Sequence, residues 1–195
     1  MADHSIAIPF IFHFAAGISG KSLSLPLEKQ FEKARLTGWS DDPDDPGGAT
    51  MIDVTIGAYA DYRIRNSRSK PSKADLRAIT FPEWADILKT MYWDRVRGDE
   101  IQSQGVANIL LDWVWASGPG SISGAQRLVG VAPDGIVGPL TVKAINGADH
   151  EALFEKIRGE RERRYRRCRG AWKYLKGWLR RLNAIRPDGT FNLPY

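Results

Sequence analysis

The stretch Gly38-Trp39-Ser40-Asp41-Asp42-Pro43-Asp44-Asp45-Pro46-Gly47-Gly48-Ala49-Thr50 decides how the rest of this sequence is interpreted. Its prolines and glycines cannot continue a helix, because proline lacks a backbone donor and glycine costs conformational entropy there. Glycine also allows the positive φ angles that a chain reversal needs. The stretch therefore predicts a shaped loop that displays four carboxylates. Composition alone also allows an acidic surface turn in which an aspartate caps the next helix.

The overall composition sets the class of protein. The chain has 195 residues, of which 43% are hydrophobic and 26% charged, which is typical of a globular protein with a sizeable core. A net charge of +5 indicates a polyanionic partner or an anionic surface, such as nucleic acid, membrane headgroups or bacterial cell wall. The single cysteine, Cys168, excludes an intramolecular disulfide, and the three histidines lack ligand spacing. We expect no metal and no cofactor.

Hydrophobic periodicity predicts a mostly helical chain. The apolar N-terminal run lacks a basic leader region and is too short to span a bilayer, which predicts a first core helix from Pro9. A protein without such a leader is either cytoplasmic or exported to the cell envelope by a non-classical or phage-type route. Thr80 and Glu83 have the spacing of a capping box. Further helices are expected at 26–35, 82–92, 106–116 and 151–182, with a possible break of the last at Gly170.

Two of these helices carry unusual charges. The helix at 106–116 is apolar nearly all round, so the carboxylate of Asp112 needs a partner or a raised pKa and is either structural or functional. The helix at 151–182 is rich in arginine and lysine, including Arg161 and Arg181. This pattern predicts a solvated basic face, or a surface for anionic cell-envelope polymers, a membrane or nucleic acid.

The loop has a specific resemblance. Residues 41–50, followed by Val54-Thr55-Ile56-Gly57, resemble the signature of the N-acetylmuramidases of glycoside hydrolase family 108, also labelled secretion activator proteins. The resemblance implies a lysozyme-like fold and hydrolysis of the MurNAc-GlcNAc linkage of peptidoglycan. In that family the motif begins with Glu-Gly-Gly and an aromatic residue, and its glutamate is the catalytic acid.

This sequence departs from the family motif at the acid. Leu36-Thr37-Gly38 stands directly before Trp39, so no glutamate occupies that place. A second alignment, which we prefer, matches the acid to Ala15 after the apolar N-terminal run. An alanine cannot donate a proton, so glycan cleavage is expected to be impaired. Glu32, the nearest glutamate before the loop, is the candidate substitute acid.

The resemblance also assigns roles within the loop. Asp45 and Thr50 match the aspartate and threonine that follow the acid in lysozyme-like enzymes of the phage type. A second, ionised carboxylate holds water or stabilises positive charge at the anomeric carbon, which suits Asp45 or Asp42, and Thr50 would position the water. Asp42 and Gly48 are expected to contact substrate. Asp53 stands where the family usually has glycine.

The aromatic candidates lie further along the chain. Tyr92 and Trp93 match the Tyr-Trp element with which the family ends its corresponding helix, and Trp113 lies in the apolar helix. Exposed indole and phenol rings can stack on sugars, with core packing as the alternative.

A second pattern lies in the C-terminal half. Residues 125–141 resemble the Gln-x-Leu-Gly…Asp-Gly-x-x-Gly-Pro-x-Thr pattern of peptidoglycan-binding modules, which makes Asp134 a candidate ligand contact. Asp134-Gly135 predicts a tight turn and Pro139 a helix start.

These observations together predict a mostly α, lysozyme-like fold with a short β-hairpin lobe and a helical, peptidoglycan-binding-like region. We expect a muramidase-like domain at 1–100 and the second region at 101–195. The expected partner is the peptidoglycan glycan strand. The alternatives are a non-catalytic peptidoglycan-binding or secretion-associated protein and, on charge alone, a nucleic-acid-associated protein.

Overall fold

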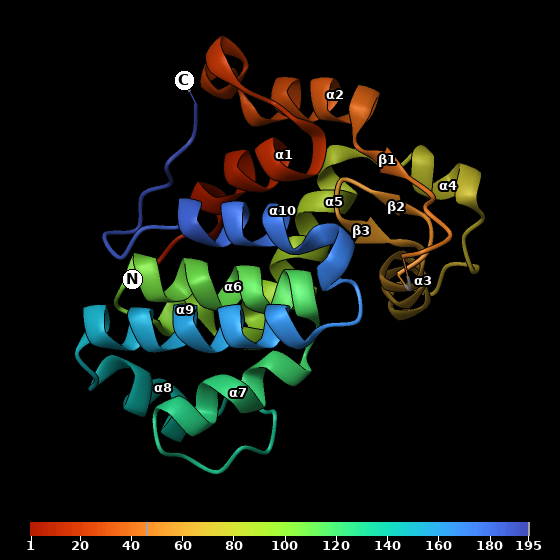
Figure 1. The fold of residues 1–195 in the computed structure, drawn as a ribbon. Coiled ribbons are helices and arrows are strands. Elements are labelled where there is room, and N and C mark those ends of the chain that lie inside the picture. The colour runs from red at the N-terminus through yellow and green to blue at the C-terminus, as the bar shows by residue number, and fades with distance from the viewer. Residues whose placement is uncertain (46, 195) are drawn as a thin grey trace. The chain divides into compact units, whose positions relative to one another are not determined.

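The computed structural model describes residues 1–45 and 47–194 and is mostly helical, with one small sheet (Figure 1). The chain forms two compact units. The N-terminal unit holds residues 5–91 and the last residues from Leu193, and the C-terminal unit holds Met1–His4 and Tyr92–Asn192. Residues 92–100, assigned from the sequence to the first domain, thus cluster with the second unit.

The N-terminal unit contains five α-helices and the sheet among its described residues. The helices are α1 Ile8–Ala16, α2 Leu27–Thr37, α3 Ile56–Arg65, α4 Lys73–Arg77 and α5 Phe81–Ile87. A π-helical turn, Leu88–Trp93, follows α5 and includes the unit boundary between Met91 and Tyr92. The strands are β1 Trp39–Ser40, β2 Thr50–Met51 and β3 Val54–Thr55, antiparallel in the order β1-β2-β3. Trp39 pairs with Met51, and Met51 pairs with Val54.

An aromatic cluster forms the core of the N-terminal unit. Phe12 of α1 lies 4.9 Å from Trp84 of α5 and 5.9 Å from Phe31 of α2, measured between ring centroids. Phe81 closes the cluster at 5.5 Å from Phe31. Rings at these distances add to the stabilisation from apolar burial. The cluster holds α1, α2 and α5 together.

The turn between β2 and β3 ties the sheet to this core. Ile52 and Asp53 both have positive φ angles, 47° and 62°, as a two-residue hairpin turn of this hand requires. Glycine suits such a position, which explains the family preference at residue 53, and aspartate tolerates it better than most residues. Ile52 is fully buried, and its carbonyl accepts a 2.9 Å hydrogen bond from the indole of Trp84. That bond helps to hold a β-branched residue in an unfavourable conformation.

The C-terminal unit is built on one central helix. Its helices are α6 Gln104–Ser117, α7 Gly120–Leu128, α8 Pro139–Asn146, α9 His150–Arg167 and α10 Ala171–Ala184. Helix α6 is buried from Gly105 to Trp115, as its all-round apolar pattern predicts, and α7 and α9 pack against it. The chain near Pro187 approaches so closely that a Cβ atom at Gly105 would lie 2.0 Å from the Pro187 carbonyl oxygen.

The buried carboxylate of α6 has two cationic partners. Asp112 lies 2.6 Å from Nη2 of Arg161 on α9 and 2.8 Å from Nε of Arg181 on α10. Burial alone would raise the pKa of Asp112, but the charges of Arg181 and Arg161 hold it below its usual value. Arg161, expected on a solvated basic face, is instead fully buried. Its guanidinium group also donates to the Ile109 carbonyl and to the Tyr165 hydroxyl, so these bonds help to compensate for the loss of water. Asp112 is therefore structural.

Helix boundaries follow the local sequence closely in most places. Thr80 and Glu83 form the capping box reciprocally, and Ser72 and Asp75 form a second one at α4. The long basic helix ends at Arg167 and restarts at Ala171, so the break predicted at Gly170 is confirmed. The helix expected at 82–92 changes at Leu88 to a π-helical turn. Within the described residues, no helix combines the length and apolarity needed to cross a bilayer.

Candidate functional site

The acidic loop between β1 and β2 is held together by its own carboxylates. Asp45 Oδ1 accepts a 2.8 Å hydrogen bond from the backbone of Gly47, and Asp42 Oδ1 accepts one of 3.0 Å from the backbone of Asp44. The hydroxyl of Thr50 donates to the Gly48 carbonyl at 2.9 Å, and Gly48 has a φ of 68°. These bonds are of the Asx and ST type that shape turns. Pro46, which the motif also contains, lies outside the described residues.

These hydrogen bonds place the carboxylates of Asp42 and Asp45 at defined positions in the loop. Asp42, Asp45, Gly48 and Thr50 are all half-buried, so each keeps some access to solvent. Asp41 at the start of the loop is anchored to Lys73 of α4 at 2.7 Å. Among the described residues, one carboxylate oxygen of Asp45 bonds to Gly47, and the other can accept a hydrogen bond from a water or face a charge on a ligand.

Both sequence alignments of the missing acid lead to one corner of the N-terminal unit. Ala15 lies in the last turn of α1 and Leu36 in the last turn of α2. The hydroxyl of Thr37 donates to the carbonyl of Ala16 at 2.6 Å, which joins the two helix ends. A Cβ atom at Gly38 would lie 2.7 Å from Ile52 and 3.3 Å from the Cβ of Ala16, so only glycine fits where β1 begins.

Neither position in this corner supplies an acid. Ala15 is half-buried, and Leu36 is 84% exposed although it is a large apolar residue. A leucine this exposed adds nothing to the core, since its side chain stays in water. The corner beside the acidic loop therefore has the backbone of a helix-to-hairpin junction without a proton donor at either aligned position.

The candidate substitute acid, Glu32, lies on the outer face of α2. Its carboxylate pairs with Lys29 at 2.9 Å, and both side chains are more than 60% exposed. Glu32 and Lys29 thus form an ordinary surface ion pair between residues one helical turn apart.

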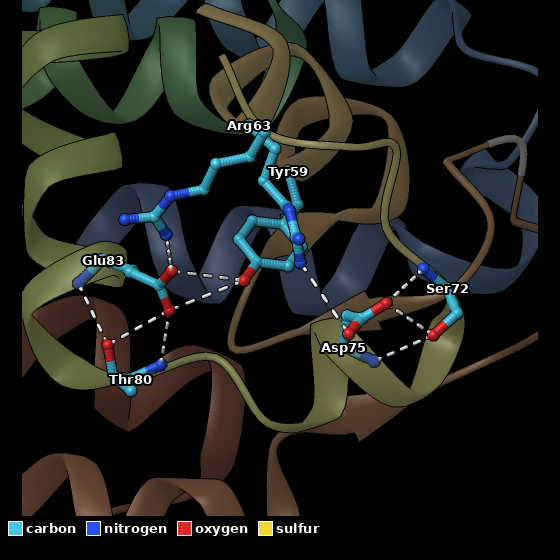
Figure 2. Close-up of polar contacts among 7 residues, drawn as sticks. Tyr59, Arg63, Ser72, Asp75, Thr80 and Glu83 are labelled. Carbon is cyan, nitrogen blue, oxygen red and sulfur yellow. Dashed lines mark hydrogen bonds and ion pairs between the residues drawn. The ribbon is translucent and has the colours of Figure 1, made fainter. Parts of the chain in front are cut away.

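Two other carboxylates of the same unit are committed to helix ends, as Figure 2 shows. Glu83 caps α5 through Thr80, lies 2.6 Å from Arg68 and receives a long, 3.5 Å hydrogen bond from Tyr59. Burial and then the charge of Glu83 raise the pKa of Tyr59.

The second of these carboxylates belongs to the capping box of α4. Hydrogen bonds from Ser72 hold the pKa of Asp75 below its usual value, and Arg63 lies 3.7 Å away (Figure 2). With its pKa lowered, Asp75 is not placed to donate a proton, and Glu83 is occupied by the α5 cap and by its ion pair with Arg68.

The aromatic candidates belong to the C-terminal unit, and two of the three are core residues. Trp93 is fully buried and donates from its indole to Asp99 at 2.6 Å, and Trp113 is 1% exposed. Tyr92 is half-buried with its ring packed edge-on against Trp115 at 4.6 Å. Core packing therefore accounts for Trp93 and Trp113, since a ring without solvent access cannot stack on a sugar.

The Gln…Asp-Gly…Thr pattern forms a clamp around a turn. The side chain of Gln126, 1% exposed, donates to Asp134 at 2.7 Å and to the Ile136 carbonyl at 3.0 Å, and accepts from Gly135 at 2.8 Å. The hydrogen bonds from Gln126 and from the backbone of Ile136 lower the pKa of Asp134. Asp134 is exposed, but one of its oxygens serves this turn. The role of Gln126 was not assigned from the sequence, although the pattern itself contains it.

An open groove lies beside the clamp in the same unit. It has a volume of about 690 Å³ and is lined by the end of α7, the following loop and α8. Its lining is largely apolar and includes Leu128, Val131 and Leu140, with Lys143 as its cation. Leu140 is 76% exposed. No pattern in the sequence indicates this groove, because the lining residues become neighbours only when the clamp folds the loop back onto α8.

Comparisons with known proteins match two stretches of the chain to family models. Residues 34–118 match the family model of glycosyl hydrolase 108, and residues 121–183 match that of a Predicted Peptidoglycan domain. The first match begins after Ala15 and includes Leu36. A search of curated protein sequences finds no match.

A solved structure gives the same result for the fold. Brucella abortus SagA is similar to this chain with a TM-score of 0.75 and 26% sequence identity, over 95% of this chain and 92% of that chain. The mostly α, lysozyme-like class predicted from the sequence is confirmed. Residues 34–118 are thus similar to the glycosyl hydrolase 108 family and residues 121–183 to the Predicted Peptidoglycan domain family.

Proposed function

We propose that this chain is a peptidoglycan-directed, muramidase-like protein that binds peptidoglycan and cleaves its MurNAc-GlcNAc linkage weakly or not at all. The two family matches support the target. The observation that carries the second part is the corner beside the acidic loop, where both aligned positions, Ala15 and Leu36, lack an ionisable group. The alternative is a non-catalytic, secretion-associated binding protein.

The chemistry explains why this corner matters. Cleavage of a glycosidic bond requires a protonated group that gives the leaving oxygen its proton, and the loss of such a group typically costs about two to four orders of magnitude in rate. The second role in cleavage, a carboxylate that holds water or stabilises positive charge at the anomeric carbon, has better candidates. Asp45 keeps one carboxylate oxygen outside its bond to Gly47, and the Thr50 hydroxyl lies nearby in the loop sequence. The remaining machinery would stabilise charge and hold water but not expel the leaving group.

The central experiment measures cleavage and binding separately. Purified protein is incubated with insoluble peptidoglycan, and both released muropeptides and protein retained on the pellet are quantified. We expect retention with little or no release. Ala15→Glu and Leu36→Glu should show which position restores the acid, and one of them should raise release at least about 100-fold. Release by the unaltered protein at the rate of the better variant would overturn the proposal of impaired cleavage.

Glu32 is tested with a matched pair on one helix. If the protein retains slow cleavage, Glu32→Gln should abolish it while Glu28→Gln, an exposed glutamate one turn earlier, should not. Equal rates in both variants would remove Glu32 from consideration as the substitute acid.

Binding is assigned to the groove beside the Gln126 clamp. An apolar lining with one cation, Lys143, suits a ligand that presents methyl groups and carboxylates, as the peptide part of peptidoglycan does. Leu140→Glu should therefore lower retention on peptidoglycan. Ile136→Glu is the control, since Ile136 is also an exposed apolar residue, at 70%, but does not line the groove. Equal retention of both variants would place the binding surface elsewhere.

A further inference from the structure

The excess positive charge of the protein is concentrated in one segment. Residues 163–181, the basic segment, hold nine of the chain's 28 basic residues and no acidic residue. The other 19 basic and 23 acidic residues leave the rest of the chain at −4, although the whole carries +5. The polyanion preference suggested by the composition therefore belongs to this segment and not to the protein as a whole.

The basic segment places most of these charges in solvent. It covers the last turn of α9, the three-residue connection Cys168–Gly170 and most of α10. On α10 the exposed positions recur at helical spacing: Trp172, Lys173, Lys176, Gly177 and Arg180. Arg164, Arg167 and Arg169 are also exposed. Within the segment, Arg163 and Arg166 pair with Glu160 and Glu162, each at 2.7 Å, and Arg181 pairs with the buried Asp112 at 2.8 Å.

One aromatic residue stands out within this cationic surface. Trp172 is 80% exposed at the start of α10, next to Lys173. The other indole of the helix, Trp178, packs within the unit against Tyr165 at 5.4 Å and Tyr174 at 5.7 Å. The apolar side of α10 is thus used for packing, and Trp172 is left out of it. An exposed indole beside lysines is the arrangement found where proteins meet the interfacial region of a lipid bilayer.

We propose that the basic segment docks the protein on a membrane surface rich in anionic phospholipid. The arginines and lysines contact headgroup phosphates, which guanidinium groups bind with two parallel hydrogen bonds, and Trp172 inserts at the headgroup level. The protein lies on the bilayer and does not cross it. Trp172 favours a lipid surface over a soluble polyanion, because a purely electrostatic partner requires no exposed indole.

The test is co-sedimentation with vesicles in the absence of peptidoglycan, so its result does not depend on the function proposed above. Phosphatidylglycerol–phosphatidylcholine vesicles should bind the protein and phosphatidylcholine vesicles should not. Lys173→Gln with Lys176→Gln should weaken partitioning about 25-fold, since each basic residue near an anionic surface contributes about five-fold. Lys33→Gln with Lys70→Gln removes the same charge from exposed sites in the N-terminal unit and should have little effect.

Salt separates the two parts of the interaction. The effect of the lysine changes should shrink between low salt and about 0.5 M salt, because ions screen charge–charge attraction. Trp172→Ala should weaken binding by a similar factor at both salt concentrations, since indole insertion is not screened. Ile64→Ala, which removes another exposed apolar side chain, 60% exposed on α3, is its control.

Three results would overturn the proposal. The first is equal binding to anionic and zwitterionic vesicles, and the second is lysine or Trp172 variants that behave like their controls. The third is retention on polyphosphate or DNA without any binding to vesicles, which would assign the basic segment to a soluble polyanion instead.

Discussion

Removal of the Asp112 carboxylate should strongly destabilise the C-terminal unit. The carboxylate joins α6 to α9 and α10 through ion pairs of 2.6 and 2.8 Å, and the exposed fractions of the side chains of Asp112, Arg161 and Arg181 are only 4%, 0% and 12%. Asp112→Ala would leave two guanidinium groups facing each other with little access to water. Breaking a buried pair in this way typically costs about 3–5 kcal/mol of unfolding free energy.

The assay is urea unfolding followed by tryptophan fluorescence and circular dichroism, with the two units analysed as separate transitions where they resolve. Given a typical urea m value of about 1–3 kcal/mol/M, the midpoint of the C-terminal unit should fall by roughly 1–5 M. Glu162→Gln is the control on α9, because it breaks the exposed pair with Arg166 and should cost less than about 1 kcal/mol. Asp112→Asn keeps the shape of the side chain and should be nearly as damaging as Asp112→Ala.

The pH dependence follows from the lowered pKa of Asp112. The folded-state pKa lies below the unfolded value of about 3.9, so the stabilisation is fully present above pH ~4 and is lost as pH falls through the folded-state pKa. The stability gap between the unaltered protein and Asp112→Asn should therefore narrow only at acidic pH. A cost below 1 kcal/mol for Asp112→Ala, or a gap that stays constant from pH 7 to pH 2, would refute this reasoning.

Three further predictions concern packing, titration and helix capping. Gly98→Ala should cost at least about 2 kcal/mol in urea unfolding, since its Cβ would lie 2.2 Å from the buried ring of Trp93; an unchanged midpoint would contradict the close approach. Burial and the hydrogen bond to Asp86 raise the pKa of Tyr62 to about 12. The stabilisation by the neutral Tyr62 hydroxyl is therefore present below pH ~10 and is lost as pH rises toward 12. A Tyr62→Phe variant should lack that loss of stability in alkaline unfolding curves. Thr80→Ala should cost about 1 kcal/mol through loss of the α5 cap, measured by the same unfolding assay, whereas no loss would show that Glu83 alone holds the helix start.

Local patterns in the sequence predicted much of the fold. Thr80 and Glu83 form the expected capping box, the break at Gly170 separates α9 from α10, and the all-round apolar helix is the buried α6. Each of these features depends on contacts within a few residues along the chain or on the average polarity of one helix. Features of this kind are set by neighbouring residues in the chain, so they can be predicted from the sequence alone.

The candidate site shows where that information ends. Arg161 and its neighbours in α9 look alike in the sequence, yet Arg161 is fully buried on Asp112, 49 positions away. Trp93 and Trp113 have the composition of sugar-stacking residues, but the structure places both in the core. The periodicity of a helix shows which side is apolar and cannot show which distant segment covers it.

The sequence by itself determined the helical class, the acidic loop and the lack of a glutamate at positions 15 and 36. Only the tertiary structure placed Ala15 and Leu36 at two joined helix ends, because the hydrogen bond from Thr37 to Ala16 and the close packing of Gly38 link segments about 20 positions apart. It also distinguished Arg161 and Arg181, which pair with the buried Asp112, from the arginines that remain in solvent. Burial depends on long-range packing, and no local pattern records it.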